Sequence, residues 1–215
     1  MNGTAEAPWW IRGLRLAFGV LGVFTLAWGP LKNLDNPAYS MANYFSYFTI
    51  QSNILAAVVL LVGGLRDPRD RRWRVFRGAA TLYMVITGII YAVLLADIDV
   101  QMQGQWTNTV LHRVIPVVML VDWLLVPAGI GVSVGLLGAW LIYPILYGVY
   151  TLIRGPIVDW YPYPFIDPRE QGYLDMALGL VVMVLVFMAL AAVVARLGVL
   201  VHRYWDSRQT HYTRA

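Results

Sequence analysis

The chain has 215 residues and contains no cysteine. Disulfide bonds, thiolate metal sites, iron–sulfur clusters and a cysteine nucleophile are therefore excluded. Charged residues are also few: they make up 13% of the chain, against about 25% in soluble proteins, whereas 59% of the residues are hydrophobic. Because about 20 apolar residues cross a bilayer, this length allows at most about six or seven crossings and no separate soluble domain.

Six apolar runs are each long enough to form a spanning helix. Short connections rich in proline, glycine, asparagine and aspartate separate them, as expected of turns. The first run exceeds the length of a signal-peptide core and is not followed by a small-residue cleavage site, so we expect it in the mature chain. The sequence thus predicts an all-α polytopic membrane protein with a single six-helix transmembrane domain over residues 1–215. The predicted spans are residues 14–31, 44–65, 78–96, 107–126, 132–153 and 174–201.

Arginines cluster between the second and third spans. The positive-inside rule places this loop in the cytoplasm, and six spans then place both termini there as well. This topology, together with attraction to anionic headgroups, accounts for the net charge of +4, so we expect membrane lipids and no nucleic acid as partners. Fifteen arginines against one lysine favour a GC-rich bacterial source, and hence the bacterial inner (plasma) membrane. The cluster consists of Arg66, Arg69, Arg71, Arg72, Arg74 and Arg77.

Polar residues gather where the second and fourth spans begin. Ser46, Thr49 and Asn53 share one face of a helix, and Asn108 and His112 lie one turn apart. By the predicted topology both spans run inward from the outer surface. We therefore expect Thr49 and His112 at the same depth, about one to two turns below that surface.

A threonine hydroxyl with a histidine as proton acceptor can attack an ester carbonyl and form an acyl-enzyme that water then cleaves. Histidine suits this role because its ordinary pKa, about 6.5, lets it take and return a proton near neutral pH. Asn108 or Asp159 are the candidates for fixing the imidazole tautomer, and Asn53 or backbone N–H groups for stabilising the oxyanion. Pro116 cannot bond the carbonyl of residue 112, which favours a bend beside His112.

The connection after the fifth span places Arg154, Asp159 and Trp160 on the same side of the membrane as the predicted pair. Its aromatic and proline residues fit an interfacial belt or a cap over a substrate pocket. Asp122 lies about 15 Å deeper than His112, too far to orient it. We expect Asp122 to pair with an arginine near the inner surface, such as Arg196 or one of the cluster.

Simpler roles compete with catalysis at each of these positions. Threonines in membrane helices usually bond a carbonyl of their own helix, as expected here for Thr25, Thr81, Thr87 and Thr151. A lone histidine within the membrane can hold two helices together. Zinc chemistry is disfavoured because it needs about three protein ligands and the other histidines lie near the C-terminus, so we expect no metal and no other cofactor.

Three segments together resemble the androgen-induced FAR-17a membrane protein family, most closely its six-span bacterial branch. The resemblance implies an integral-membrane hydrolase of fatty acid esters of hydroxy fatty acids, with Thr49 as nucleophile, His112 as base and a lipid ester as substrate. The segments are Tyr47-Phe48-Thr49-Ile50-Gln51-Ser52-Asn53, then Asn108 with His112 and Pro116, and Tyr143-Pro144 with Trp160-Tyr161-Pro162-Tyr163-Pro164-Phe165.

Two other classes of function fit the sequence. The first is a small-molecule or proton-coupled transporter, or a lipid-binding membrane protein without catalysis, in which His112 and Asp122 could relay protons across the span. A non-catalytic partner subunit could dock other helices through small residues such as Gly131 and Gly135.

Overall fold

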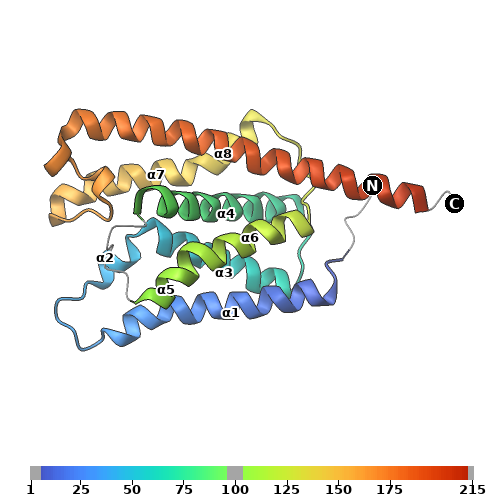
Figure 1. The fold of residues 1–215 in the computed structure, drawn as a ribbon, viewed down its shortest axis with the longest axis horizontal. Helices are drawn as coiled ribbons and strands as arrows, with labels where there is room; N and C mark the ends of the chain where they lie inside the picture. Colours follow the sequence, from blue (N-terminus) through green and yellow to red (C-terminus); the bar gives the residue numbers. More distant parts are fainter. Residues whose placement is uncertain (1–5, 96–103, 213–215) are drawn as a thin grey trace.

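The computed structural model describes residues 6–95 and 104–212 and is a bundle of long helices, with α1 beginning and α8 ending at the same end of the bundle (Figure 1). Two π-helical segments extend or interrupt these helices, at Tyr91–Leu95 and Val110–Val114. The α-helices are α1 Trp9–Lys32, α2 Met41–Phe45, α3 Phe48–Leu65, α4 Arg71–Ile90, α5 Gln105–Thr109, α6 Ile115–Leu125, α7 Val134–Val158 and α8 Pro168–Tyr212.

The all-α prediction and the number of spans are confirmed for the part of the chain that the structure describes. Six helices there are long and apolar enough to cross a membrane, so the chain is an integral membrane protein by length and composition. These spans are Trp9–Lys32, Phe48–Leu65, Arg71–Leu95, Gln105–Leu125, Val134–Val158 and Gln171–Ser207.

Some predicted boundaries need correction. The second span, predicted from residue 44, is interrupted because Tyr47 has an extended backbone, and α3 begins only at Phe48. The third span starts at Arg71 rather than at 78, because Asp70 caps the helix by accepting the Trp73 N–H. Its predicted last residue, 96, lies outside the described residues.

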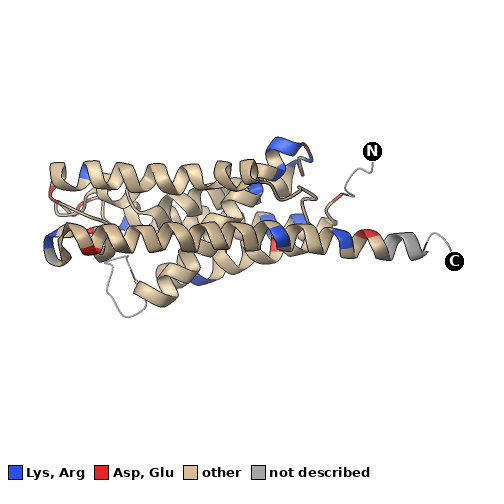
Figure 2. Ribbon diagram, turned by 90° about the horizontal axis from the view of Figure 1, so that it is seen from above, with Lys and Arg blue, Asp and Glu red and all other residues tan. Residues whose placement is uncertain are grey.

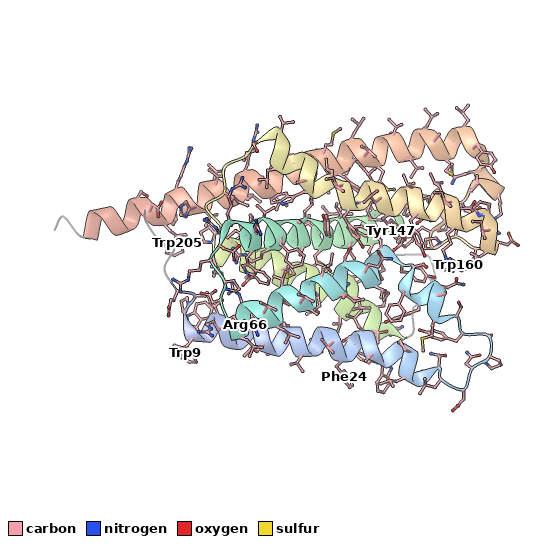
Figure 3. The ribbon with its side chains drawn as sticks, turned by 180° about the vertical axis from the view of Figure 1, so that it is seen from behind. Trp9, Phe24, Arg66, Tyr147, Trp160 and Trp205 are labelled. Atoms are coloured by element: carbon pink, nitrogen blue, oxygen red, sulfur yellow. The ribbon has the colours of Figure 1, made fainter. Side chains whose placement is uncertain are left out.

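The two ends of the bundle differ in charge. We use the name arginine end for the end of the bundle where α1 begins, α3 connects to α4 and α8 ends. The opposite end, with α2 and the α7–α8 connection, is the site end. Figure 2 shows most of the basic residues toward the arginine end, and Figure 3 labels Arg66 there and Trp160 at the site end. This asymmetry is the pattern expected when the arginine end faces the cytoplasm.

Two fully buried tryptophans pack between the long helices near the arginine end. Trp123 of α6 and Trp140 of α7 pack edge to face, with ring centroids 6.2 Å apart. Trp140 donates its indole N–H to the Val75 carbonyl of α4, and Trp123 donates to a carbonyl of α8. Gly78 lets α4 approach this closely, because a side chain there would collide with both rings.

A buried ion network joins three helices at the arginine end. Asp122 accepts hydrogen bonds from Arg15 Nε at 2.6 Å and from Arg77 Nη1 at 3.1 Å. Arg15 also reaches Asp67 in the α3–α4 connection, at 3.0 Å. The predicted pairing of Asp122 with an arginine of the cluster is thus confirmed through Arg77, while Arg15 rather than Arg196 is the second partner.

Candidate functional site

The fold brings the predicted threonine and histidine into direct contact. Thr49 is the second residue of α3, and His112 lies in the π-helical segment between α5 and α6. Thr49 Oγ1 is 3.2 Å from His112 Nε2, and the residues are only 3% and 2% exposed. The two polar groups therefore meet at one depth, near the site end.

The second ring nitrogen of His112 fixes the direction of this hydrogen bond. Nδ1 lies 3.1 Å from the main-chain carbonyl oxygen of Asn108. A carbonyl oxygen can only accept, so Nδ1 carries the proton and Nε2 is left as an acceptor for the Thr49 hydroxyl. Asn108 is therefore the tautomer-fixing residue, acting through its backbone rather than its side chain.

A tyrosine that no sequence pattern singles out supports the imidazole from one side. The Tyr91 ring stacks on the His112 ring, with centroids 4.3 Å apart and planes 23° from parallel. The Tyr91 hydroxyl accepts a hydrogen bond from Asn108 Nδ2 at 2.7 Å. Tyr91 and His112 both lie in π-helical segments, a conformation frequently found at functional sites.

Pro116 explains why the helix widens at His112. It has no N–H to bond the carbonyl of His112, as the sequence predicts. The π-helical segment Val110–Val114 ends just before it. On the facing helix, a side chain at Gly88 would press on the Pro116 ring, so glycine permits the close approach of α4.

Tyr163, from the α7–α8 connection, contacts Thr49 twice. The Thr49 N–H donates to the Tyr163 hydroxyl oxygen at 3.3 Å, and that oxygen lies 3.4 Å from Thr49 Oγ1. Because the Thr49 hydroxyl donates to His112, the Tyr163 hydroxyl is the donor toward Thr49 Oγ1. Burial raises the pKa of the Tyr163 phenol, so it stays protonated and able to donate.

Thr49 lines a cavity of about 220 Å³, and His112 is not part of its lining. Residues of α3, α4, α7, α8, the π-helical segment Tyr91–Leu95 and the α7–α8 connection line it, and nearly all of them are apolar. Ile145 of α7 and Val184 of α8, both lining residues, are also 49% and 40% exposed, so the cavity reaches the membrane-facing surface between these helices. The polar side chains in its lining are Thr49, Thr87, Tyr147 and Tyr163.

The hydrogen bonds predicted for the other threonines are present at three of the four positions. Thr25, Thr81 and Thr151 each donate to the carbonyl four residues earlier, at 2.8–2.9 Å. The prediction for Thr87 is wrong, because its buried hydroxyl has no hydrogen-bond partner in the part of the chain that the structure describes.

Asn53 does not offer the free donor predicted for an oxyanion. Its Nδ2 donates to the Thr49 carbonyl at 2.9 Å and to the Leu111 carbonyl at 3.2 Å, so both amide hydrogens are used. The second bond ties α3 to the segment that carries His112. We therefore correct its role to one of positioning.

Asp159, the other predicted tautomer-fixing residue, is wrong for that role. Its side chain is 88% exposed and pairs with Arg169 at 2.6 Å. Asp159 ends α7 in a left-handed conformation, with φ of 50°, which turns the chain into the loop. A carboxylate exposed in this way cannot reach the buried His112.

The three other predicted residues, Ser46, Arg154 and Trp160, lie in a separate cluster at the α7–α8 connection. Ser46 Oγ lies 2.6 Å from the Ala42 carbonyl and 2.8 Å from the Tyr150 hydroxyl. The Arg154 guanidinium lies over the Trp160 ring, 5.3 Å from its centroid. Trp160 in turn packs edge to face on Tyr47, which also contacts the Tyr163 ring. Arg154 and Tyr47 thus pack against Trp160 of the connection that carries Tyr163, while Ser46 joins the α2 segment to α7.

A Gly-x-Ser-x-Gly sequence occurs at Gly131-Val132-Ser133-Val134-Gly135, but it is not a nucleophile elbow. Ser133 is exposed at the arginine end and caps α7 by accepting the Leu136 N–H at 3.1 Å. Its hydroxyl is therefore a helix cap. Among the described residues, no three histidine, aspartate or glutamate side chains converge as metal ligands would.

The fold and the site define a polytopic α-helical membrane protein with a buried threonine–histidine contact. Comparisons of the chain with protein-family models, with curated proteins and with solved structures found no match. The family resemblance stated above therefore stays a prediction.

Proposed function

We propose that this protein is a lipid ester hydrolase of the membrane, with Thr49 as nucleophile and His112 as base. One observation carries the proposal: the Thr49 hydroxyl is hydrogen-bonded to an acceptor nitrogen of His112, and Thr49 lines an apolar cavity. A hydroxyl activated by a base, on a residue beside a space that can hold an acyl chain, is an arrangement suited to acyl transfer. The resemblance to the FAR-17a family points to the same chemistry.

In the first half-reaction, Thr49 Oγ1 forms a bond to the ester carbonyl carbon while its proton passes to His112 Nε2. The resulting imidazolium is stabilised because Nδ1–H donates to the Asn108 carbonyl. The bond between the carbonyl carbon and the alcohol oxygen then breaks, and the leaving alcohol takes the proton from Nε2.

In the second half-reaction, a water molecule gives a proton to His112 Nε2 and attacks the acyl carbon. The bond to Thr49 Oγ1 breaks, Oγ1 regains the proton, and the carboxylic acid leaves. The tetrahedral intermediates carry a negative oxygen beside the N-terminus of α3, whose dipole favours negative charge. Besides the protonated His112, the Tyr163 hydroxyl, 3.4 Å from Thr49 Oγ1, is a side-chain donor for this charge.

Replacing Tyr163 with phenylalanine should lower kcat by about 10²-fold with little change in KM, because a donor to the oxyanion acts mainly in the transition state. Steady-state hydrolysis of a p-nitrophenyl acyl ester in detergent micelles measures both constants. Tyr173→Phe is the matched control, since Tyr173 is 74% exposed. Equal rates in both variants would remove Tyr163 from the mechanism.

The proposal as a whole is tested by covalent labelling. A lipid-like fluorophosphonate should react with the purified protein, forming a bond from Thr49 Oγ1 to phosphorus with loss of fluoride. Mass mapping should place the label on Thr49, and His112→Ala should abolish it. A label on another residue, or ester hydrolysis that continues in a protein which takes no label, contradicts the assignment.

The sidedness of the membrane is part of the proposal. The basic residues of the arginine end support a cytoplasmic location for both termini. The site would then lie in the outer leaflet, and the arginine-rich composition supports a bacterial inner membrane.

A lipid-binding role without catalysis is the second candidate, because the cavity is almost wholly apolar. It predicts retention of bound lipid with no turnover of esters. A proton relay through Asp122 has less support, since two buried arginines hold that carboxylate. Gly131 and Gly135, suggested for docking a partner subunit, lie on the exposed surface.

A further inference from the structure

A second, charged hollow lies at the arginine end, between the α3–α4 connection, the first turns of α4 and the α6–α7 connection. We call it the Arg74 pocket. Its volume is about 30 Å³, and since about 10–15 Å³ of such space holds one water, it admits a group of a few atoms rather than a whole ligand. The charged residues that line it are Arg15, Arg69, Arg74, Arg77 and Asp67.

Three of the four arginines in this lining are paired with carboxylates. Arg15 and Arg77 share Asp122 in the buried network described above. Arg69 pairs with Glu6 at 3.1 Å. The charges of these three guanidinium groups are therefore already met by the protein.

Arg74 is the exception. Its Nη1 donates to the Ala128 carbonyl at 2.8 Å, but no ion pair of the described residues includes it. Its Nε is enclosed without a hydrogen-bond partner, whereas Nη2, which also lacks a partner there, is not enclosed. The pocket thus contains a half-buried guanidinium with an unbalanced charge and an accessible donor.

The surroundings of the pocket add positive charge. Arg66, Arg71 and Arg72 are exposed in the α3–α4 connection and the first turn of α4. Against them stands Asp70, whose side chain caps α4. Such an excess of one sign attracts anions, and guanidinium groups bond phosphate oxygens with well-matched N–H donors. A phosphate oxygen is therefore a ligand that fits both the charge and the size of the pocket.

An apolar groove beside the pocket indicates a lipid as the source of this phosphate. The groove has a volume of about 140 Å³ and lies between α1 and α6. Arg15 lines both hollows, so they adjoin. The groove is apolar apart from Arg15 and its partner Asp122, and its lining residues Leu14 and Val117 are exposed on the membrane-facing surface. A phospholipid likewise has a charged phosphate next to apolar chains.

We propose that the Arg74 pocket binds the phosphate of an anionic phospholipid, with Arg74 donating to its oxygens, and that the groove between α1 and α6 holds an acyl chain of the same lipid. Phosphatidylglycerol should be preferred to phosphatidylcholine, because the arginines repel the choline cation. The site lies at the opposite end of the bundle from Thr49, so the inference does not rest on the proposed hydrolase function.

The melting temperature reports this binding, because a ligand that binds only the folded state stabilises it. Purified protein in nonionic micelles is titrated with phosphatidylglycerol or with phosphatidylcholine of the same acyl chains. Phosphatidylglycerol should raise the melting temperature by about 3–6 °C, and phosphatidylcholine by much less. In Arg74→Gln the same rise should need about tenfold more phosphatidylglycerol, the effect of losing one charge-assisted hydrogen bond.

Arg72→Gln is the matched control. It removes the same charge from the same end of α4, but Arg72 is exposed and does not line the pocket, so its titration should match that of the unmodified protein. Equal weakening by both variants would indicate diffuse attraction to a basic surface and would overturn the site.

Glutamine at position 74 can still donate to the Ala128 carbonyl. Should Arg74→Gln nevertheless fail to fold, Arg74→Lys replaces it and should shift the titration in the same direction, because an ammonium lacks the planar pair of donors. A titration of Arg74→Lys equal to that of the unmodified protein would then count against the site. No preference for phosphatidylglycerol over phosphatidylcholine in the unmodified protein overturns the inference whatever the variants do.

Inorganic phosphate distinguishes the two sources of the anion. At millimolar concentration, with sodium chloride of equal ionic strength as the reference, it should raise the melting temperature far less than phosphatidylglycerol does, because it has no acyl chain for the groove. A rise as large as that with phosphatidylglycerol would assign the pocket to a free anion and overturn the lipid assignment.

Discussion

Alanine in place of His112 should lower kcat for a lipid ester by about 10³-fold, because the Thr49 hydroxyl then has no acceptor for its proton. Thr49→Ala should cause a loss of the same order, since it removes the attacking oxygen. The double variant should be about as slow as either single variant, because the two residues act as one unit. Turnover in micelles, with melting temperature measured on the same samples, separates chemistry from folding.

His202→Ala is the matched control for this pair. His202 lies toward the arginine end and pairs with Asp206 at 3.3 Å, so its loss should leave ester turnover unchanged. Undiminished turnover in both Thr49→Ala and His112→Ala would discard the catalytic pair. Loss of turnover with a matching loss of melting temperature would instead assign the contact to the packing of α3 against the π-helical segment.

Removing the carboxylate of Asp122 should be the most destabilising single change at the arginine end. Asp122→Ala leaves the guanidinium groups of Arg15 and Arg77 buried without their shared counter-charge, and breaking such a pair costs about 3–5 kcal/mol. The free energy of unfolding from a denaturant titration in mixed micelles measures the effect.

Asp159→Asn provides the comparison, because the side chain of Asp159 is 88% exposed, its ion pair with Arg169 faces solvent, and asparagine tolerates the left-handed backbone at this position. No change in unfolding free energy is expected for it. If Asp122→Ala unfolds at the same denaturant concentration as the unmodified protein, the network does not hold α1, α4 and α6 together.

Hydropathy and helical spacing were sufficient to predict the parts of the site that depend on regular geometry. Six spans follow from apolar runs, and the meeting of Thr49 with His112 follows from the depth that alternation assigns to each. The pairing of Asp122 with an arginine follows from the cost of a lone charge in the membrane. The first two of these predictions rest on a length or a period that the sequence displays, and the third rests on the chemistry of a charged side chain.

The supporting contacts could not be predicted in the same way. One extra residue in a helical turn rotates the side chains that follow, so the stacking of Tyr91 on His112 depends on two π-helical segments that have no clear sequence signal. The Asn108 contact runs through a carbonyl, which every residue carries. Asp159 was chosen for its chemistry alone, and a left-handed turn at the end of α7 points the chain elsewhere.

The boundary of the cavity at Ile145 and Val184 has a consequence for how the protein would be assayed. On the proposed function, a substrate enters sideways from the bilayer and its products return there, without passing through water. The rate would then follow the mole fraction of substrate in the membrane, and diluting it with inert lipid should slow the reaction even at a constant bulk concentration.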